Sequence, residues 1–355
     1  MQTHPPTPTP EQWFHERATH YVEAQVLFHL NQSGVLNLVD AEGPLTVREI
    51  AARLGLVPHV LSCCLDYVTN VDRLFEVDDE GRYGFTDFGR RVLARYSRDD
   101  IDRRNFNLFD VRVGSYGPVW SNLTDLLSGE QAYGEGVART GEHAAIGVYK
   151  VAPNFLPTVE RVLTEAGIGK VVEFGVPTGA LARILAAHPQ LQGVGIDKDA
   201  AALEDASRRA QELGVDRIDW VHGDFFEPDT WVDAARGDVP TAIGTIHFHE
   251  LVADGGVRLQ QTLRELATRL PGHYLFAIES SRLPAEARDE VPDTVWLYSH
   301  SNVLIHHLIE NGRIFTKDRW VQVFADAGCR VVRVEPLNYL GYHLYLFQLP
   351  TTQEA

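Results

Sequence analysis

The sequence predicts two structural parts: a mostly helical N-terminal domain and a C-terminal α/β domain with a mostly parallel sheet. Three observations support this prediction. The chain has 355 residues, which is enough for two domains that each bury a core. Residues 11–110 show apolar positions at helical spacing, with one short hairpin. From about Lys170 onward, short apolar runs alternate with helical segments, which is typical of a sheet covered by helices on both faces.

The first domain reads as a set of helices followed by a hairpin. A long helix begins near residue 11 and ends at Gly34, and two shorter helices flank Gly55. Thr46 and Glu49 form a capping-box pattern at the start of the first of these shorter helices. The stretch L-F-E-V-D-D-E-G-R-Y-G-F-T then alternates around D-D-E-G like a β-hairpin. This order predicts a winged-helix domain.

A winged helix suggests either DNA binding or dimerisation. The second of the short helices, P-H-V-L-S-C-C-L-D-Y-V, carries no Lys or Arg that would contact bases or phosphates. The formal net charge of -17 also opposes binding to nucleic acid or to an anionic membrane surface. We therefore expect residues 11–110 to form the dimerisation domain of a homodimer, with a DNA-binding regulator as the alternative. Residues 111–168 are assigned to a helical linker and pocket lid.

Composition restricts the location of the protein. No apolar run approaches the roughly 18 residues that a membrane span needs. Residues 1–10 have neither a basic start nor an apolar core, so they are expected to be a disordered lead-in and not a signal peptide. The three cysteines give neither a disulfide framework nor a C-x-x-C zinc spacing. A cytoplasmic location is the simplest expectation.

In the α/β domain, residues 169–355, the ligand site should lie where the parallel strands end. Acidic and glycine residues occur at these places. The first strand runs into E-F-G-V-P-T-G (Glu173–Gly179), a tight turn before a helix whose N-terminus favours electron-rich groups. The second strand ends at Asp197, suited to a ribose diol. The third ends in G-D-F-F, where Asp224 could bind an adenine amino group and Phe225 could stack on the ring.

These segments resemble the S-adenosylmethionine-dependent small-molecule methyltransferases that carry an N-terminal winged-helix dimerisation domain. The resemblance extends through F-H-E-L-V-A-D-G-G-V-R-L and G-R-I-F-T-K-D-R-W, in family order, over nearly the whole chain. It implies a Rossmann-like class I methyltransferase domain with a closing antiparallel hairpin. It also assigns the cofactor residues: Glu173, Gly175 and Gly179 to the methionine end, Asp197 to the ribose, and Asp224 with Phe225 to the adenine.

The turn after the first strand departs from the family pattern. The family is usually glycine-rich where this chain has Val176 and Pro177. Proline fixes φ near -65° and removes a hydrogen-bond donor, so local cofactor contacts are expected to differ.

The fourth strand ends in T-I-H-F-H-E-L, where O-methyltransferases of this type have L-H-D-W. The resemblance places His249 on the catalytic histidine and Glu250 on the aspartate. Leu251 replaces the tryptophan, and His247 is an additional residue assigned to the substrate side.

A second histidine cluster, Y-S-H-S-N-V-L-I-H-H-L, follows the fifth strand. If His300 faces His249, the two form a metal site for iron or zinc, completed by Glu250 or His247. His306 and His307 are expected to be peripheral. The alternative is that the histidines of this cluster are ordinary helix-surface residues.

Such a metal makes the chain similar to the metal-dependent α-keto-acid C-methyltransferases, which supply β-methyl amino acids for nonribosomal peptide antibiotics. The expected reaction is methylation of C3 of a 2-oxo acid through a metal-chelated enolate. The alternative is an O-methyltransferase in which His249 is the general base. Trp120, Val303 and Leu304 are candidates for an apolar substrate pocket, which favours a branched aliphatic or aromatic acid. Arg112 is a candidate for its carboxylate.

Overall fold

The computed structural model describes residues 9–94, 109–141, 143, 154–176, 179–245, 248–308, 312–337 and 341–351. The chain divides into two compact units, residues 1–150 and residues 151–355. Among the described residues, no helix combines the length and the apolar character that a bilayer crossing requires.

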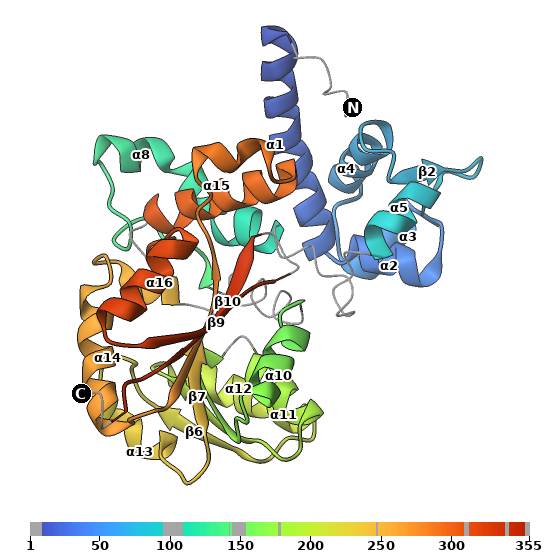
Figure 1. Cartoon of the computed structure of the whole chain (residues 1–355). Helices are drawn as coiled ribbons and strands as arrows, with labels where there is room; N and C mark the ends of the chain where they lie inside the picture. Colours follow the sequence, from blue (N-terminus) through green and yellow to red (C-terminus); the bar gives the residue numbers. More distant parts are fainter. Residues whose placement is uncertain are drawn as a thin grey trace. The chain divides into compact units, whose positions relative to one another are not determined.

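The first unit has the predicted helices and wing (Figure 1). Its elements are α1 (Pro10–Gln32), α2 (Val35–Glu42), β1 (Leu45–Thr46), α3 (Val47–Leu54), α4 (Pro58–Asn70), β2 (Phe75–Val77), β3 (Arg82–Phe85) and α5 (Asp87–Ala94). The predicted capping box of Thr46 and Glu49 is present at the start of α3. Strands β2 and β3 form the predicted hairpin, and β1 completes an antiparallel sheet in the order β1-β3-β2. The winged-helix prediction is thereby confirmed.

Three short helices follow in the same unit: η2 (Asp110–Ser115), α7 (Gly117–Ser121) and α8 (Leu123–Ser128). The first is a π-helix, a form that is rare in proteins and frequent near functional sites. Trp120 lies just after it, and its Nε1 donates a hydrogen bond to the carbonyl oxygen of Arg112 at 2.9 Å.

The second unit is built on a seven-stranded sheet in the order β6-β5-β4-β7-β8-β10-β9. The strands are β4 (Lys170–Phe174), β5 (Gln192–Asp197), β6 (Ile218–His222), β7 (Thr241–Thr245), β8 (Tyr274–Ser280), β9 (Arg330–Pro336) and β10 (Tyr342–Gln348). Pairs among β4 to β8 are parallel, whereas β10 pairs antiparallel with both β8 and β9. The predicted mostly parallel sheet with a closing antiparallel hairpin is confirmed.

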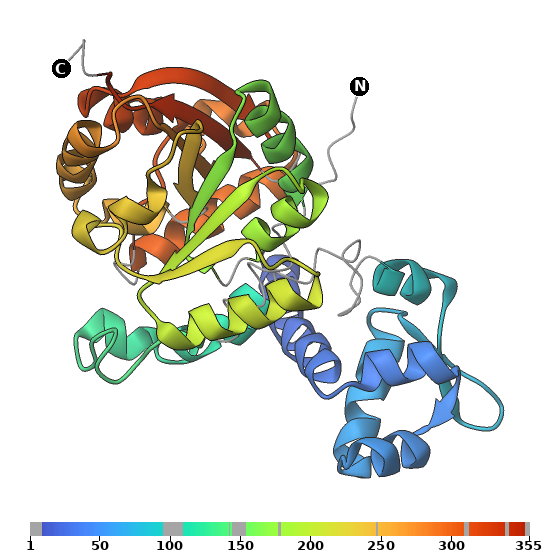
Figure 2. The same ribbon diagram turned by 90° about the horizontal axis from the view of Figure 1, so that it is seen from below.

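Helices cover both faces of this sheet (Figure 2). Apolar side chains of α13 (Val232–Ala235), α14 (Val257–Arg269) and α16 (Lys317–Asp326) share one hydrophobic core with β4, β5, β7 and β10. Alternate residues of β4 point to the other face, where α10 (Leu156–Glu165) and α11 (Ala180–Ala187) pack. Helix α12 (Ala200–Glu212) covers β5 and β6. Helix α10, which the sequence placed in the linker, belongs to this unit.

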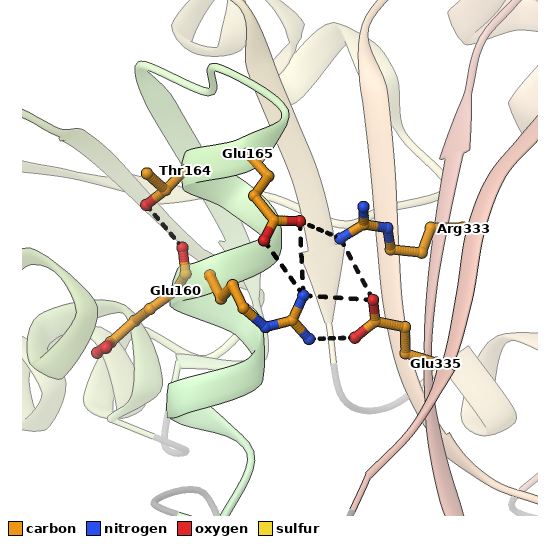
Figure 3. A network of polar contacts seen from close by, with 6 residues as sticks. Glu160, Thr164, Glu165, Arg333 and Glu335 are labelled. Atoms are coloured by element: carbon orange, nitrogen blue, oxygen red, sulfur yellow. Dashed lines mark hydrogen bonds and ion pairs between the residues drawn. The ribbon is translucent and has the colours of Figure 1, made fainter.

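An ion-pair network fastens α10 to the edge strand β9 (Figure 3). Arg161 contacts both Glu165 and Glu335, and Arg333 contacts the same two carboxylates. Four alternating charges in one network hold their geometry better than a single surface pair, so the network stabilises this corner of the fold modestly.

Candidate active site

The turn after β4 has a backbone that only glycine adopts readily. Gly175 and Gly179 have φ of 78° and 62°, and the second of them is the N-cap of α11. Glu173 is buried, and its Oε2 accepts a hydrogen bond from the amide of Leu181 in the first turn of α11 at 3.1 Å. Val176 is buried, while Pro177 lies outside the described residues. A ligand can therefore approach the backbone closely beside Gly175.

The acids at the ends of β5 and β6 are each held by one carboxylate oxygen. Asp197 Oδ1 accepts from the amide of Asp199 at 2.9 Å, and Asp224 Oδ1 accepts from the amide of Phe226 at 2.9 Å. The second oxygen of each accepts no hydrogen bond from the part of the chain that the structure describes. Because β4, β5 and β6 are adjacent and parallel, both carboxylates lie along the same edge of the sheet as Gly175. This arrangement fits the ribose and adenine of S-adenosylmethionine.

Phe225 lies deeper in the fold than the neighbouring Phe226. Its side chain is only 3% exposed, and its ring contacts Phe174, Phe226, Trp231 and Phe248 in the hydrophobic core. Its contact with the adenine stays a prediction. The half-buried ring at this strand end is that of Phe226, and the guanidinium of Arg258 lies over it, 4.0 Å from the ring centre. The sequence alone does not show which of two adjacent phenylalanines at a strand end the core encloses.

His249 lies in the short helix η6 (Phe248–Val252), which follows β7, and it is buried. It contacts Glu279 on the neighbouring strand β8. Oε2 of Glu279 lies 2.8 Å from the ring Nδ1, while Oε1 accepts from the backbone amide of the same histidine at 3.0 Å. Glu279 is 1% exposed, so burial raises the pKa of its carboxyl, and the interactions with His249 oppose that rise.

The backbone of His249 is held from the other side as well. Its carbonyl oxygen accepts a hydrogen bond from the amide of Arg313 at 2.8 Å. Gly312, with φ of 146°, packs so closely that a Cβ there would lie 2.3 Å from this carbonyl oxygen. The position of the imidazole is therefore fixed by a carboxylate on one side and by a glycine-containing loop on the other.

Helix α15 (Asp293–Leu308) brings a second imidazole to the first. The ring centre of His306 lies 4.3 Å from that of His249 in an edge-to-face arrangement, and both side chains are 8% exposed. His306 was expected to be peripheral, and this expectation is wrong. The adjacent His307 has a structural contact, since its Nε2 accepts from the amide of Ile314 at 3.0 Å. Burial, with Arg313 and Arg282 nearby, lowers the pKa of His307, which keeps it neutral as an acceptor.

The predicted pairing of His249 with His300 is not found. His300 is exposed, its Nδ1 bonds the carbonyl oxygen of Trp296 at 3.0 Å, and its ring stacks on the Trp296 indole. The reason is helical phase: six residues separate His300 from His306, so the two point roughly 120° apart around α15. Among the described residues, no group of three or more His, Cys, Asp or Glu side chains is arranged to hold a metal ion. His247, one of the two candidates for a third ligand, lies outside the described residues, and within the described part of the chain the predicted metal site of His249 and His300 is not found.

The remaining predicted residues differ in burial and lie in different parts of the chain. Glu250 is half-buried in η6, Val303 is half-buried on α15, and Leu304 is 53% exposed on the same helix. Trp120 and Arg112 lie in the first unit, and their roles in substrate binding stay predictions. His247 lies outside the described residues.

Glu279 is the residue that the sequence reasoning missed. A signal was present: the fifth strand, Y-L-F-A-I-E-S, carries an acid near its carboxyl end, where the same reasoning selected Asp197 and Asp224. A charged residue within an otherwise apolar buried strand requires a partner, and the neighbouring strand supplies His249.

A polar network holds α15 against the end of β8. Ser299 Oγ donates to the carbonyl oxygen of Ser281 at 3.0 Å and accepts from the amide of Leu283 at 3.1 Å. One turn along the helix, Asn302 Nδ2 donates to Ser280 Oγ at 2.9 Å. These groups are buried or half-buried, so a position of α15 that left them without hydrogen bonds would be costly. The network therefore fixes the helix that carries His306.

Comparisons with known proteins agree with this fold. Residues 171–272 match the family described as "Methyltransferase domain". A curated relative, demethylspheroidene O-methyltransferase from Cereibacter sphaeroides, is 27% identical over 228 residues, which is 59% of this chain and 56% of that protein. The chain thus matches little more than half the length of this relative.

Solved structures resemble nearly the whole chain. The mitomycin 7-O-methyltransferase MmcR is 18% identical with a TM-score of 0.65, covering 96% of this chain and 97% of that one. Human N-acetylserotonin methyltransferase, solved in complex with SAM, is 18% identical with a TM-score of 0.65, covering 98% and 100%. At this identity the likeness shows the fold. The chain has a Rossmann-like fold of the kind found in these methyltransferases, preceded by a helical domain, and its residues 171–272 match the methyltransferase-domain family.

Proposed function

We propose that this protein is an S-adenosylmethionine-dependent methyltransferase that transfers a methyl group to a hydroxyl oxygen of a small molecule. The observation that carries the proposal is the two-point contact between Glu279 and His249, through ring Nδ1 and backbone amide. It gives a buried imidazole with a fixed ring orientation and a carboxylate behind it, which is the arrangement of an oriented general base. The match to a methyltransferase domain supplies the reaction class.

The cofactor would be held along the carboxyl ends of β4 to β6. The turn at Gly175, where the side chain is absent and φ is positive, would accommodate its methionine end. The second carboxylate oxygens of Asp197 and Asp224, whose first oxygens bond backbone amides, would accept hydrogen bonds from ribose hydroxyls and an adenine amino group. When bound, S-adenosylmethionine supplies an electrophilic methyl group on a sulfonium sulfur.

His249 would act through Nε2, because its Nδ1 faces Glu279. Nε2 would take the proton of the substrate hydroxyl. The resulting alkoxide or phenoxide oxygen would bond to the methyl carbon that the cofactor supplies as the bond from that carbon to sulfur breaks, which leaves a neutral thioether. The buried Glu279 carboxylate stabilises the imidazolium that forms, since the two opposite charges meet at 2.8 Å in a site of low polarity. The proton leaves the site when the imidazolium releases it to solvent after the product departs.

Methylation of C3 of a 2-oxo acid is the second candidate, and the His306 ring next to His249 favours it. An O-methyltransferase needs one imidazole as base. Removal of a C3 proton by His249 produces an enolate, and an imidazole N–H of His306 can donate a hydrogen bond to the enolate oxygen. The product would be a β-methyl 2-oxo acid, a precursor of β-methyl amino acids for peptide antibiotics.

One experiment separates the two reactions. The protein is incubated with S-adenosylmethionine carrying a ¹³C-labelled methyl group and with parallel panels of phenols, hydroxyquinones and branched or aromatic 2-oxo acids. NMR distinguishes an oxygen-bound methyl carbon from a carbon-bound one directly. A labelled methyl ether supports the main proposal, whereas a labelled C3-methyl acid supports the second candidate. No transfer to either panel, from protein that binds the cofactor, would contradict both.

The cofactor site has its own test. Asp197→Asn should weaken binding of S-adenosylmethionine by roughly 1–3 kcal/mol, because a charge-assisted hydrogen bond to the ribose is lost. Calorimetry measures this, with Asp219→Asn on the neighbouring strand β6 as the matched control. Unchanged affinity in Asp197→Asn would remove this residue from the site.

A further inference from the structure

The N-terminal unit contains a cavity of about 390 Å³ that the proposed methyl transfer does not use. It lies between α1, α2, α5 and the segment that joins α4 to β2. Its volume is within the range of small-molecule binding sites. Most of its wall is apolar, formed by Leu27, Leu36, Leu74, Phe85, Phe88 and Phe109, among others.

Two carboxylates interrupt this apolar wall. Glu23 comes from α1 and Asp72 from the segment before β2, and they are the only ionisable side chains among the described lining residues. The Oδ2 atom of Asp72 is buried and has no hydrogen-bond partner in the described part of the chain. Within the described lining, these two carboxylates thus have no basic side chain beside them.

The basic side chains that the structure describes near the cavity have other contacts or are exposed. On α5, Arg90 contacts Asp87 and the carbonyl oxygen of Phe85, and Arg91 lies over the outer Phe88 ring. Arg73 is exposed. On α4, burial raises the pKa of the Tyr67 hydroxyl, with further contributions from Glu23 and Asp72, so this group stays neutral.

Asp72 is protonated more readily than an ordinary aspartate in this environment. Burial, and then the neighbouring Glu23 carboxyl, raise the pKa of Asp72 to about 7. Near neutral pH a bound cation can therefore replace the proton on Asp72.

The segment that carries Asp72 is held rigidly. Arg73 has φ of 55°, a left-handed conformation that is uncommon for a residue with a side chain. Thr86 Oγ1 donates to the Arg73 carbonyl oxygen at 2.7 Å, and the Thr86 amide donates to that of Leu74 at 3.0 Å. Gly89 of α5 approaches so closely that a Cβ there would lie 2.0 Å from the Leu74 carbonyl oxygen. The carboxylate is thus positioned before any ligand arrives.

We propose that this cavity binds an organic amine, with its ammonium group between Glu23 and Asp72 and its apolar body against Leu36, Phe85 and Phe109. Charge complementarity selects the cation, because the described part of the lining offers two acids and no base. The apolar wall selects a ligand with a hydrocarbon or aromatic body over a metal ion or a small polyamine. The site is independent of the proposed methyl transfer.

The test uses the full-length protein and three probes of the same shape: 4-phenylbutylamine, 4-phenyl-1-butanol and 4-phenylbutanoate. Calorimetry at pH 8 should show the amine binding at least tenfold more tightly than the alcohol, and the acid not binding. At pH 6 the amine should bind more weakly and release protons, which appears as a dependence of the heat on the ionisation enthalpy of the buffer.

The variant is Glu23→Gln with Asp72→Asn, which keeps side-chain shape and removes both charges. It should lose the preference for the amine, while Glu76→Gln on the exposed edge of β2 should keep it. A retained cooperative melting transition verifies that the N-terminal unit of each variant is folded. Equal binding of amine and alcohol, or amine binding that the double variant retains, would overturn the proposal. So would a dimer whose formation excludes the amine, because the occupant would then be a second copy of this chain.

Discussion

Glu279 contacts one histidine at two points, through the ring and through the backbone amide, and this contact decides which ring nitrogen faces a substrate. Glu279→Gln keeps the shape and removes the charge that stabilises the imidazolium. We expect kcat to fall by about 10²–10⁴-fold, the usual contribution of general base catalysis. Affinity for S-adenosylmethionine, measured by calorimetry, should stay unchanged. Glu286→Gln, in an exposed turn, is the control, and wild-type turnover in Glu279→Gln would remove the pair from the mechanism.

The adjacent histidines of α15 should behave differently when replaced. His306→Phe keeps a ring against His249 and removes its nitrogens, so we expect kcat to fall about tenfold or more with little change in the melting temperature. His307→Phe removes the acceptor of the Ile314 amide, so we expect a loss of about 1–3 kcal/mol in the free energy of unfolding. Steady-state kinetics and urea denaturation of both variants provide the comparison. An equal fall of kcat in the two variants would mean that His306 has no catalytic role that His307 lacks.

At the residue scale, the acids at the strand ends could be predicted from the sequence. The residues whose role depends on the direction of the side chain could not. Asp197 and Asp224 follow from the rule that parallel strands end at one edge. His306 could not be chosen over His300, because that choice needs the phase of α15 relative to β7, which no local pattern specifies. Phe225 and Phe226 differ in the same way, since only the packed core shows which ring is enclosed.

At the element scale, the loop before α16 controls the site by contact with the backbone of His249. Gly312→Ala would place a Cβ 2.3 Å from the His249 carbonyl oxygen, and the loop or η6 would have to move. We expect a loss of activity of at least tenfold and a lower melting temperature, because the φ of 146° is also strained for alanine. Gly237→Ala, where nothing lies within 4 Å, is the matched control. Full activity in Gly312→Ala would show that this loop does not fix His249.

The elements themselves were largely predictable from sequence. Alternating apolar runs specified the strands of the parallel sheet, and the D-D-E-G turn specified the wing. The π-helix at Asp110–Ser115 was not predictable, because its hydrogen-bond pattern differs from an α-helix by one residue while the apolar spacing stays similar.

At the scale of the whole molecule, α1 exposes more aromatic surface than a monomer usually leaves in water. Trp13, Phe14 and Tyr21 are 45%, 69% and 57% exposed on its N-terminal half. We expect these side chains to be covered in a homodimer. Light scattering at micromolar concentration should give twice the chain mass for the wild type and the chain mass for Phe14→Asp. A wild-type monomer, or a dimer that Phe14→Asp leaves intact, would contradict this.

Stability of the N-terminal unit should depend on pH through Asp72. The pKa of this carboxyl is raised from 3.8 to about 7 in the folded chain, so between these values the folded state holds a proton that the unfolded state has lost. The free energy of unfolding therefore falls as pH rises from about 4 to 7 and stays lower above that. Asp72→Asn should gain on the order of 1 kcal/mol over wild type at pH 8 and nothing at pH 4, since partial exposure screens the effect. Melting curves at both pH values give the difference, and an equal difference at both would exclude Asp72 as the cause.

The charged network of Figure 3 has a consequence for behaviour at high concentration. Strand β9 is an edge of the seven-stranded sheet, and an open edge is a template on which another chain can add a strand and start aggregation. Here Arg330, Arg333 and Glu335 are interspersed with valines along it, and Pro336 removes a donor at its end. A bulge at Val332, opposite Leu346 and Phe347, bends the strand. An incoming strand would have to bury these charges, so side chains that fasten α10 also oppose pairing of this edge with another copy of the protein.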